Sequence, residues 1–222
     1  MRLGIWVAAV FYGPSAFGQI GPVSIGAKVG VPLADALEVS SPESCAGAAV
    51  CSILNYSSKT KRYTLGPTVE LRLPHGLGVE IEALYSRLNY DSYFFSSRPS
   101  SGQLSAFSSA RADRWNFPIL LKWRQDVPAI SPFIDGGVAF DHIRGVESNF
   151  LNGTSSNAPE LTNPTSEGLV AGGGIDFRVV RYLHLIPEIR YTRWFSRNFT
   201  PALGTAFGTN QNEATFLLGI TF

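Results

Sequence analysis

Apolar and polar side chains alternate along eight segments of the chain, which lie at residues 22–32, 62–73, 76–90, 112–125, 131–144, 166–180, 182–195 and 212–222. Such alternation places the apolar residues on one face of an extended strand and the polar residues on the other. In the last segment, one face carries Phe216, Leu218, Ile220 and Phe222. Each segment reaches the length of a strand that crosses a bilayer, about 9–11 residues. The pattern predicts an all-β protein of eight strands.

The connections between these segments alternate in length. Short turns are expected at 74–75, 126–130 and 181, and long loops at 33–61, 91–111, 145–165 and 196–211. Short turns on one rim and long loops on the other are typical of an antiparallel up-and-down barrel in an outer membrane. An even number of strands places both chain ends on the rim of short turns, so the last strand is expected to close against the first.

The charged residues of the predicted strands fall mainly on the face opposite the apolar one. The acids on this face are Glu70, Glu80, Glu82, Asp135, Asp141, Asp176 and Glu188, and the bases are Lys28, Arg72, Arg114, Lys122, Arg124, Arg178 and Arg190. A charge that faces lipid costs about 2–4 kcal/mol near the bilayer midplane. Charges inside a narrow barrel can neutralise each other, whereas an unpaired buried charge is costly. We therefore expect the charged face to line the lumen.

Strand adjacency predicts particular ion pairs in that lumen. We expect Glu80 and Glu82 to contact Lys122 and Arg124. Two further candidate pairs are Lys28 with Glu70 and Asp176 with Arg190. An eight-stranded barrel has an interior just wide enough for side chains, so these pairs should fill it and exclude a wide pore.

The composition supports a chain with little surface in water. Charged residues make up 16% of the 222 residues, below the roughly 25% of typical soluble chains. The net charge of +1 leaves no basic surface for nucleic acid. No apolar run reaches the roughly 18 residues of a membrane helix, so a membrane-spanning form of this chain must be a closed barrel. The alternation alone leaves a soluble sandwich open.

The N-terminus favours the membrane alternative. It carries Arg2, an apolar stretch over residues 3–12, and the small residues Ala16 and Gly18 before Gln19. This order is typical of a secretory signal peptide with cleavage after residue 18. We therefore expect a signal peptide at 1–18 and one barrel domain at 19–222.

Aromatic residues favour the same alternative, because they gather toward the two expected rims. Tyr63, Tyr85, Trp115 and Phe140 lie toward the long loops, and Trp123, Tyr182 and Phe222 toward the short turns. Aromatic residues are enriched at both interfaces of a membrane.

The two cysteines, Cys45 and Cys51, lie in the first long loop. In an exported chain such a pair is expected to form a disulfide. A loop this short contributes about 2 kcal/mol on the loop-entropy account. The segment has neither a histidine nor a second cysteine pair, which argues against a metal site.

Several runs of the chain resemble the small outer-membrane β-barrel domains related to outer membrane protein A. These runs are WNFPILLKWR (115–124), SPFIDGGVAF (131–140), GLVAGGGIDFR (168–178) and LIPEIRYTRWF (185–195). The terminal Phe222, with apolar residues at alternate positions before it, resembles the signal that the barrel-assembly machinery recognises. The resemblance implies export and insertion as a monomer into a bacterial outer membrane, among its lipids and lipopolysaccharide.

Three functions remain open at this point. We favour a structural or surface-interaction role, in which the long loops contact an extracellular ligand. A narrow gated pore is the second, because rearranged ion pairs could open a path. A lipid A-modifying enzyme is the third. His184 and Glu188 share a strand face but lie about 13 Å apart along it, and we find no serine that completes a triad with them. We therefore expect no enzymatic activity and no cofactor.

Overall fold

The computed structural model describes residues 23–39, 43–45, 51–58, 63–98, 102–125, 127, 130–151, 160–161, 163–180, 182–200 and 207–222. The predicted signal peptide at 1–18 lies outside these ranges, so it stays a prediction. Within the described ranges, no helix is long and apolar enough to cross a membrane.

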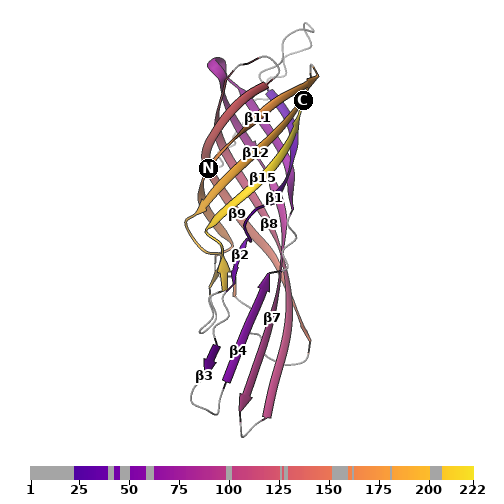
Figure 1. Ribbon diagram of the computed structural model, residues 1–222, viewed down its shortest axis with the longest axis vertical. Coiled ribbons are helices and arrows are strands. Elements are labelled where there is room, and N and C mark those ends of the chain that lie inside the picture. The colour runs from indigo at the N-terminus through magenta and orange to yellow at the C-terminus, as the bar shows by residue number, and fades with distance from the viewer. Residues whose placement is uncertain are drawn as a thin grey trace, which may run out of the picture.

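Eight antiparallel strands close into a barrel, as predicted (Figure 1). In ring order they are β1 (Val23–Pro32), β5 (Thr64–Arg72), β6 (Leu77–Glu82) with β7 (Leu84–Arg98), β8 (Gly102–Arg124), β9 (Ile130–Leu151), β11 (Thr165–Val180), β12 (Leu183–Trp194) and β15 (Asn212–Thr221). β6 and β7 act as one strand, interrupted at Ala83, which donates a backbone hydrogen bond to Pro67. β15 pairs with β1, with Val29 opposite Leu218. The last strand therefore closes the ring against the first.

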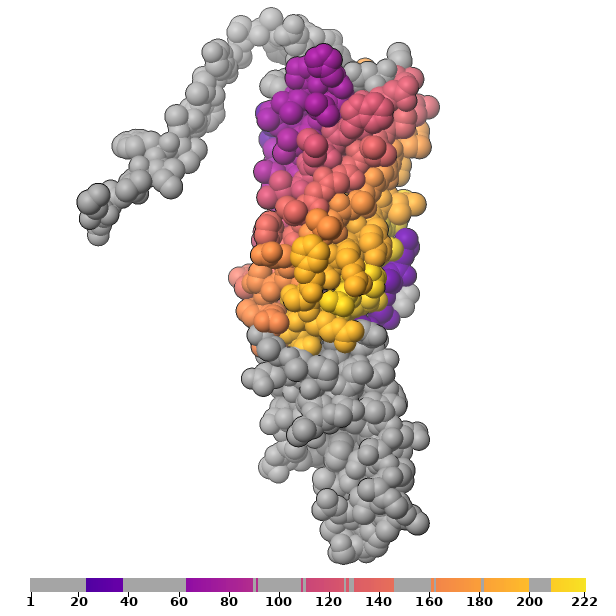
Figure 2. Space-filling model, turned by 90° about the vertical axis from the view of Figure 1, so that its left-hand side faces the viewer, coloured from indigo at the N-terminus to yellow at the C-terminus, as the bar shows by residue number. Residues whose placement is uncertain are grey.

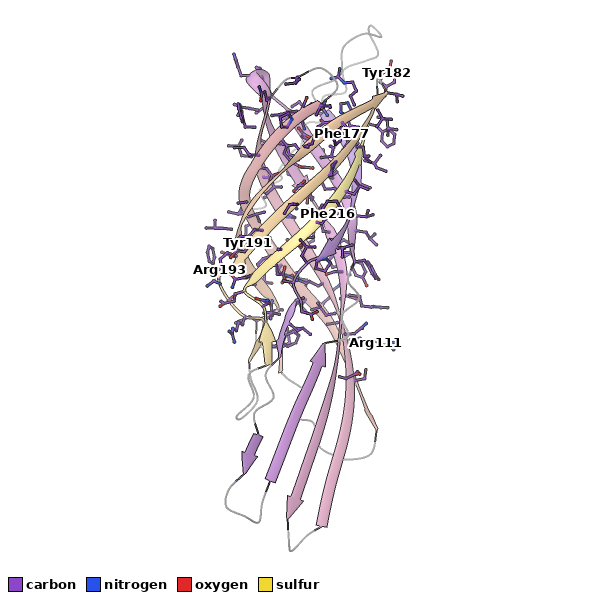
Figure 3. All side chains as sticks on the ribbon, in the orientation of Figure 1. Arg111, Phe177, Tyr182, Tyr191, Arg193 and Phe216 are labelled. Atoms are coloured by element: carbon purple, nitrogen blue, oxygen red, sulfur yellow. The ribbon has the colours of Figure 1, made fainter. Side chains whose placement is uncertain are left out.

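The side chains alternate across the barrel wall as the sequence pattern predicts. Apolar side chains such as Ile25, Ile134 and Ile189 point outward and are about 60% exposed. Lys28 and Glu188, on the opposite phase of two of the same strands, are at most 1% exposed. Figure 3 shows outward side chains along the whole barrel, including Phe216 on β15 and Tyr182 near the end where β11 meets β12. The apolar belt thus faces outward and the ionic face lines the lumen.

The described short connections lie at the same end of the barrel. Residues Pro74–Gly76 form a single 3₁₀ turn, in which His75 and Gly76 both have positive φ. A Cβ atom at Gly76 would overlap the backbone carbonyl of Arg124 at the end of β8. The turn is therefore fitted closely against the neighbouring strand.

The predicted long loops contain more strand than expected. Residues 91–98 and 102–111 continue β7 and β8, and residues 145–151 continue β9. Further short strands are β2 (Leu37–Val39), β3 (Glu43–Cys45), β4 (Cys51–Ser58), β10 (Glu160–Leu161), β13 (Phe199–Thr200) and β14 (Phe207–Thr209). The prediction that these segments are loops was wrong. It relied on the alternation of apolar and polar side chains, which a strand beyond the bilayer does not need because no face of it meets lipid.

At the end of the barrel that carries the long connections, these strands form one larger sheet and two short strand pairs. β4 pairs with β7 through residues 51–58 and 90–97, and β3 pairs with β4. Together with the outer parts of β7, β8 and β9 they form a sheet that projects beyond the barrel, which we call the projecting sheet (Figure 1). Nearer the barrel, β2 pairs with β14 and β10 pairs with β13.

Candidate functional site: the barrel lumen

Lys28 is at the centre of the largest group of charges in the lumen. Its Nζ lies 2.5 Å from Glu82, 2.6 Å from Glu188 and 3.1 Å from Glu80. Lys122 Nζ also contacts Glu80, at 2.5 Å, and the hydroxyl of Thr68 donates a hydrogen bond to the same carboxylate. The acids of the middle lumen are therefore held by ammonium groups from two strands.

Arg190 connects this group across the lumen. Its Nη1 and Nη2 donate to the two oxygens of Glu82 at 2.6 and 2.8 Å, and its Nε donates to Glu188 at 2.8 Å. β6 and β12 are four strands apart in either direction round the ring of eight, so this bidentate contact spans the diameter of the barrel.

A second contact spans the lumen nearer the long-connection end. Arg114 on β8 donates to both oxygens of Glu213 on β15, at 2.6 and 3.1 Å. These strands also lie opposite each other in the ring. Arg114 donates to Asp141 at 3.0 Å as well, and its guanidinium lies 5.2 Å from the ring centre of Trp194.

Nearer the short turns, the pairing is looser. Arg124 donates from Nη2 to Glu70 at 3.0 Å. Asp176 Oδ1 and His184 Nδ1 lie 2.6 Å apart, at hydrogen-bond distance. Arg72 Nη2 reaches only to 3.7 Å from Asp176, on the opposite side of the ring.

An apolar cluster lies between the charged lumen and the projecting sheet. Its buried members are Ala36, Leu37, Leu88, Ala112, Ile143 and Phe199, with Leu161 packed against them. Asn198 accepts a hydrogen bond from the hydroxyl of Thr209 and donates one to the backbone carbonyl of Asn163, which joins the segments that carry the cluster. We call this cluster the apolar cap.

All ten residues predicted as interior ion-pairing groups are buried: Lys28, Glu70, Glu80, Glu82, Lys122, Arg124, Asp135, Asp176, Glu188 and Arg190. Of the pairs expected from strand adjacency, Lys122 with Glu80 is present. Arg178, also assigned to the inner face, is exposed because it lies near the rim.

The other expected pairs were wrong. Lys28 binds Glu80, Glu82 and Glu188 in place of Glu70, which pairs with Arg124. Lys28 misses Glu70 because the two residues differ in height: in the β1–β5 register Glu70 lies opposite Ser24, four residues from Lys28. The narrow bore lets the long side chain of Lys28 reach β6 and β12, which are not neighbours of β1.

The expected pair of Asp176 with Arg190 failed for the same reason of height. In the β11–β12 register, Arg190 lies opposite Gly172, four residues from Asp176. Four residues correspond to about 13 Å along a strand. Asp176 contacts His184 instead, which lies opposite Arg178, only two residues away.

Asp135 is the exception among the buried acids. It is 7% exposed, yet neither of its carboxylate oxygens has a hydrogen-bond partner within the described structure. The prediction that it is ion-paired is therefore not met by a direct hydrogen bond.

Besides the contacts of Lys28 and that of Glu82 with Arg190, two further contacts escaped the sequence reasoning. The bidentate contact of Arg114 with Glu213 joins residues 99 positions apart, and strand adjacency does not relate them. The contact of His184 with Asp176 was detectable, because both residues fall on the inner phase of neighbouring strands near one turn. Ser131 lines the same cavity as this pair, but its hydroxyl donates to the backbone carbonyl of Val127.

Glu80, Glu82 and Glu188 present carboxylate oxygens within 4.8 Å of one another, a spacing that could hold a metal ion. The ammonium group of Lys28 already lies within 3.1 Å of all three. A cation is thus supplied by the chain itself.

The remaining predicted groups are placed as follows. The backbone register sets Cys45 directly opposite Cys51 in the β3–β4 pair, and a disulfide between them stays a prediction. The apolar face of the last strand, Phe216, Leu218, Ile220 and Phe222, points out of the barrel, with Phe222 69% exposed. Figure 2 shows one side of the barrel, where outward side chains cover the wall.

Comparisons with known proteins agree with this architecture. Residues 16–200 match the family model described as outer membrane protein β-barrel domain. Among solved structures, OprG from Pseudomonas aeruginosa aligns with a TM-score of 0.53 at 15% identity, over 91% of this chain and 96% of that one. Neisserial surface protein A, from Neisseria, aligns with a TM-score of 0.48 at 11% identity, over 90% and 96% of the two chains.

A comparison with curated protein sequences finds no significant match. The family model nevertheless covers most of the chain, and the closed barrel with its outward apolar belt fits it. The chain belongs to the outer membrane protein β-barrel domain family and is a protein of the bacterial outer membrane.

Proposed function

We propose that the chain is a surface-interaction barrel, in which a closed, ion-paired cylinder holds the projecting sheet outside the membrane. The observation that carries the proposal is the pairing of β4 with β7 over residues 51–58 and 90–97. This pairing turns two connections, which would otherwise be separate loops, into one sheet with β8 and β9. Recognition commonly uses connections that a rigid scaffold positions.

The lumen supports this role over conduction. Two bidentate contacts, Glu82 with Arg190 and Arg114 with Glu213, cross the bore at different heights. The apolar cap lies beyond them toward the projecting sheet. A solute on the axis would have to break buried charge pairs and displace packed apolar side chains. The barrel therefore serves better as a rigid support than as a pathway.

The membrane-facing surface supports a monomer surrounded by lipid. The ring of strands is closed, so none of its strands has a free edge in the bilayer. The outward apolar residues suit acyl chains and the outer end suits lipopolysaccharide. Insertion by the barrel-assembly machinery, through the terminal strand, is part of the proposal.

The experiment compares the whole chain with a trimmed barrel on the bacterial surface. In the trimmed variant, residues 40–62 are replaced by a short Gly/Ser linker and Asn89 is joined to Arg111, its pairing partner, by an Asn-Gly turn. Both forms are first checked for the heat-dependent gel mobility of a folded barrel. Adhesion of cells to surfaces coated with extracellular-matrix protein or with polysaccharide is then measured. We expect the whole chain to promote adhesion and the trimmed barrel to lose this effect.

Two further measurements on the whole chain separate the other candidate functions. The first is single-channel recording in planar bilayers. If the whole chain gives steady currents, and Glu82→Gln or Lys122→Gln abolishes them, the chain is a narrow pore and the proposal is wrong. A change in lipid A mass when the chain is expressed would replace it with a lipid-modifying enzyme. Equal adhesion of the whole and trimmed forms contradicts the role of the projecting sheet directly.

A further inference from the structure

A cavity of about 200 Å³ opens inside the barrel at the end of the short turns. Three arginines line it, Arg72 from β5, Arg124 from β8 and Arg178 from β11. His184 and Asp176 lie in its wall, and the turn that contains His75 forms its rim. Thus three strands bring three guanidinium groups around one small space, and one turn closes its rim.

The guanidinium groups in this cavity have N–H donors without acceptors. Arg124 is 9% exposed, and its Nε has no hydrogen-bond partner. The Nε and Nη2 atoms of Arg72 are also buried without a hydrogen-bond partner. The nearest carboxylate oxygens to these atoms lie at 3.4–3.9 Å, on Glu70 and Asp176. Buried donors without acceptors are costly, so this end of the lumen has unused capacity to bind an anion.

Elsewhere in the lumen, two arginines have carboxylate acceptors for their Nε, Nη1 and Nη2 donors. Arg190 donates to two carboxylates from Nε, Nη1 and Nη2. Arg114 likewise donates to two carboxylates from three nitrogens. Arg124 differs, since its Nη2 is bound to Glu70 and its Nε faces Asp176 only at 3.4 Å. The contrast indicates that Arg72 and Arg124 keep N–H donors that the nearby carboxylates of Glu70 and Asp176 do not bind at hydrogen-bond distance.

The charge balance at this level is also positive. Arg72, Arg124 and Arg178 oppose the two carboxylates of Glu70 and Asp176, and Oδ1 of Asp176 is engaged by His184 at 2.6 Å. An incoming anion would therefore meet a net cationic wall. The wall of the cavity is held in place, because Asp176 contacts His184 and the turn at Gly76 packs closely against the backbone of Arg124.

We propose that this cavity binds an oxyanion of the phosphate class between Arg72 and Arg124. Planar guanidinium groups donate paired hydrogen bonds that match phosphate oxygens, and a cavity of about 200 Å³ has room for one such group together with bound water. The group can come from free phosphate or from the headgroup of an anionic phospholipid at the same rim.

The test titrates inorganic phosphate into the whole folded chain in neutral detergent micelles, at low ionic strength, by calorimetry. The variants are Arg72→Gln and Arg124→Gln. The matched control is Arg87→Gln, which removes the same charge from an exposed position on β7. Folding of each variant is checked by gel mobility with and without heating. The phosphate-induced rise in the unfolding temperature provides a second readout.

We expect one saturable site in the wild-type chain, and a loss of affinity of about 10-fold or more in each cavity variant, as charged hydrogen bonds are removed. The Arg87→Gln control should bind as the wild type does. No saturable binding by the wild-type chain overturns the proposal, as does wild-type affinity in both folded cavity variants.

The two sources are separated by repeating the titration in lipid nanodiscs. If a phospholipid headgroup occupies the cavity, phosphate binds more weakly in phosphatidylglycerol discs than in phosphatidylcholine discs. If free phosphate is the occupant, its affinity is the same in both. Either result with the expected loss in the variants supports the oxyanion site.

Discussion

Arg190 on β12 donates hydrogen bonds to both carboxylate oxygens of Glu82, at 2.6 and 2.8 Å. Glu82 lies on β6, in the opposite wall of the barrel. Neither residue is more than 4% exposed. The contact acts as a strut across the lumen, and Lys28 and Glu188 extend it to a third strand. The stability of the cylinder should therefore depend on this contact more than on ion pairs at its surface.

Breaking this strut is expected to destabilise the barrel strongly. Glu82→Gln leaves Arg190 and Lys28 without one carboxylate, and removal of one partner from a buried pair costs about 3–5 kcal/mol. Arg190→Met should cost a similar amount, and the double variant should cost clearly less than the sum of the two. The measurement is the free energy of unfolding by urea in lipid vesicles.

The matched control for the strut is the exposed pair of Arg87 and Asp113, whose side chains are 44% and 36% exposed. Arg87→Gln should change the free energy of unfolding by about 1 kcal/mol or less. Equal costs at the buried and exposed pairs would show that Glu82 and Arg190 do not meet in the folded protein.

The apolar cap gives a second prediction. Phe199 is 1% exposed and packs among Leu37, Leu88 and Ile143. Phe199→Ala leaves a cavity and should lower the free energy of unfolding by about 3–5 kcal/mol. Phe195→Ala, at a position 61% exposed on the same connection, is the control and should have little effect. If both substitutions cost the same, the cap is not packed as described.

The exposed terminal residue gives a third prediction, which concerns assembly rather than stability. Phe222 is 69% exposed and projects from the end of β15. If it is part of an assembly signal, Phe222→Ala should reduce the amount of folded barrel in the outer membrane while the purified chain still refolds in detergent. Phe216→Ala, on the same strand face, tests whether the terminal position matters in particular. Unchanged levels of folded protein for Phe222→Ala would argue against the signal.

The cysteine pair gives a fourth prediction. Cys45 and Cys51 lie directly opposite each other in the β3–β4 register, and exported chains favour disulfides. The chain isolated from an outer membrane should lose two protons relative to its reduced mass and should resist alkylation until reduced. Cys45→Ser, which leaves one thiol, should be alkylated without prior reduction. Alkylation of both thiols in the unreduced wild-type chain would contradict the disulfide.

The barrel could be predicted from the sequence because lipid imposes a strict alternation on every strand that crosses it. Residues such as Leu121 and Lys122 follow it and point to opposite faces, at 58% and 1% exposed. Outside the bilayer this constraint ends, which is why the outer part of β7 and the pairing of β4 with it were missed. Which strand each charge belongs to could be read from the pattern.

Which partner each charge takes could not be read in the same way. The contacts of Glu82 with Arg190 and of Arg114 with Glu213 depend on the bore and on the height of each residue. The order of the strands gives neither the bore nor the height. It was enough to predict the contact of Lys122 with Glu80, because these residues lie on neighbouring strands.

The orientation of the barrel wall is tested most directly by spin labels on two consecutive residues of β8, Leu120 and Leu121. Leu120 is 0% and Leu121 58% exposed. Each is replaced by a labelled cysteine in a Cys45→Ser, Cys51→Ser background, and the chain is folded into lipid vesicles. Collision rates are then measured with oxygen, which enters the bilayer, and with a water-soluble nickel complex.

The label at Leu121 should collide often with oxygen and rarely with nickel, and the label at Leu120 should be shielded from oxygen. A label at Leu121 that meets nickel as freely as a water-exposed site and rarely meets oxygen would contradict the account.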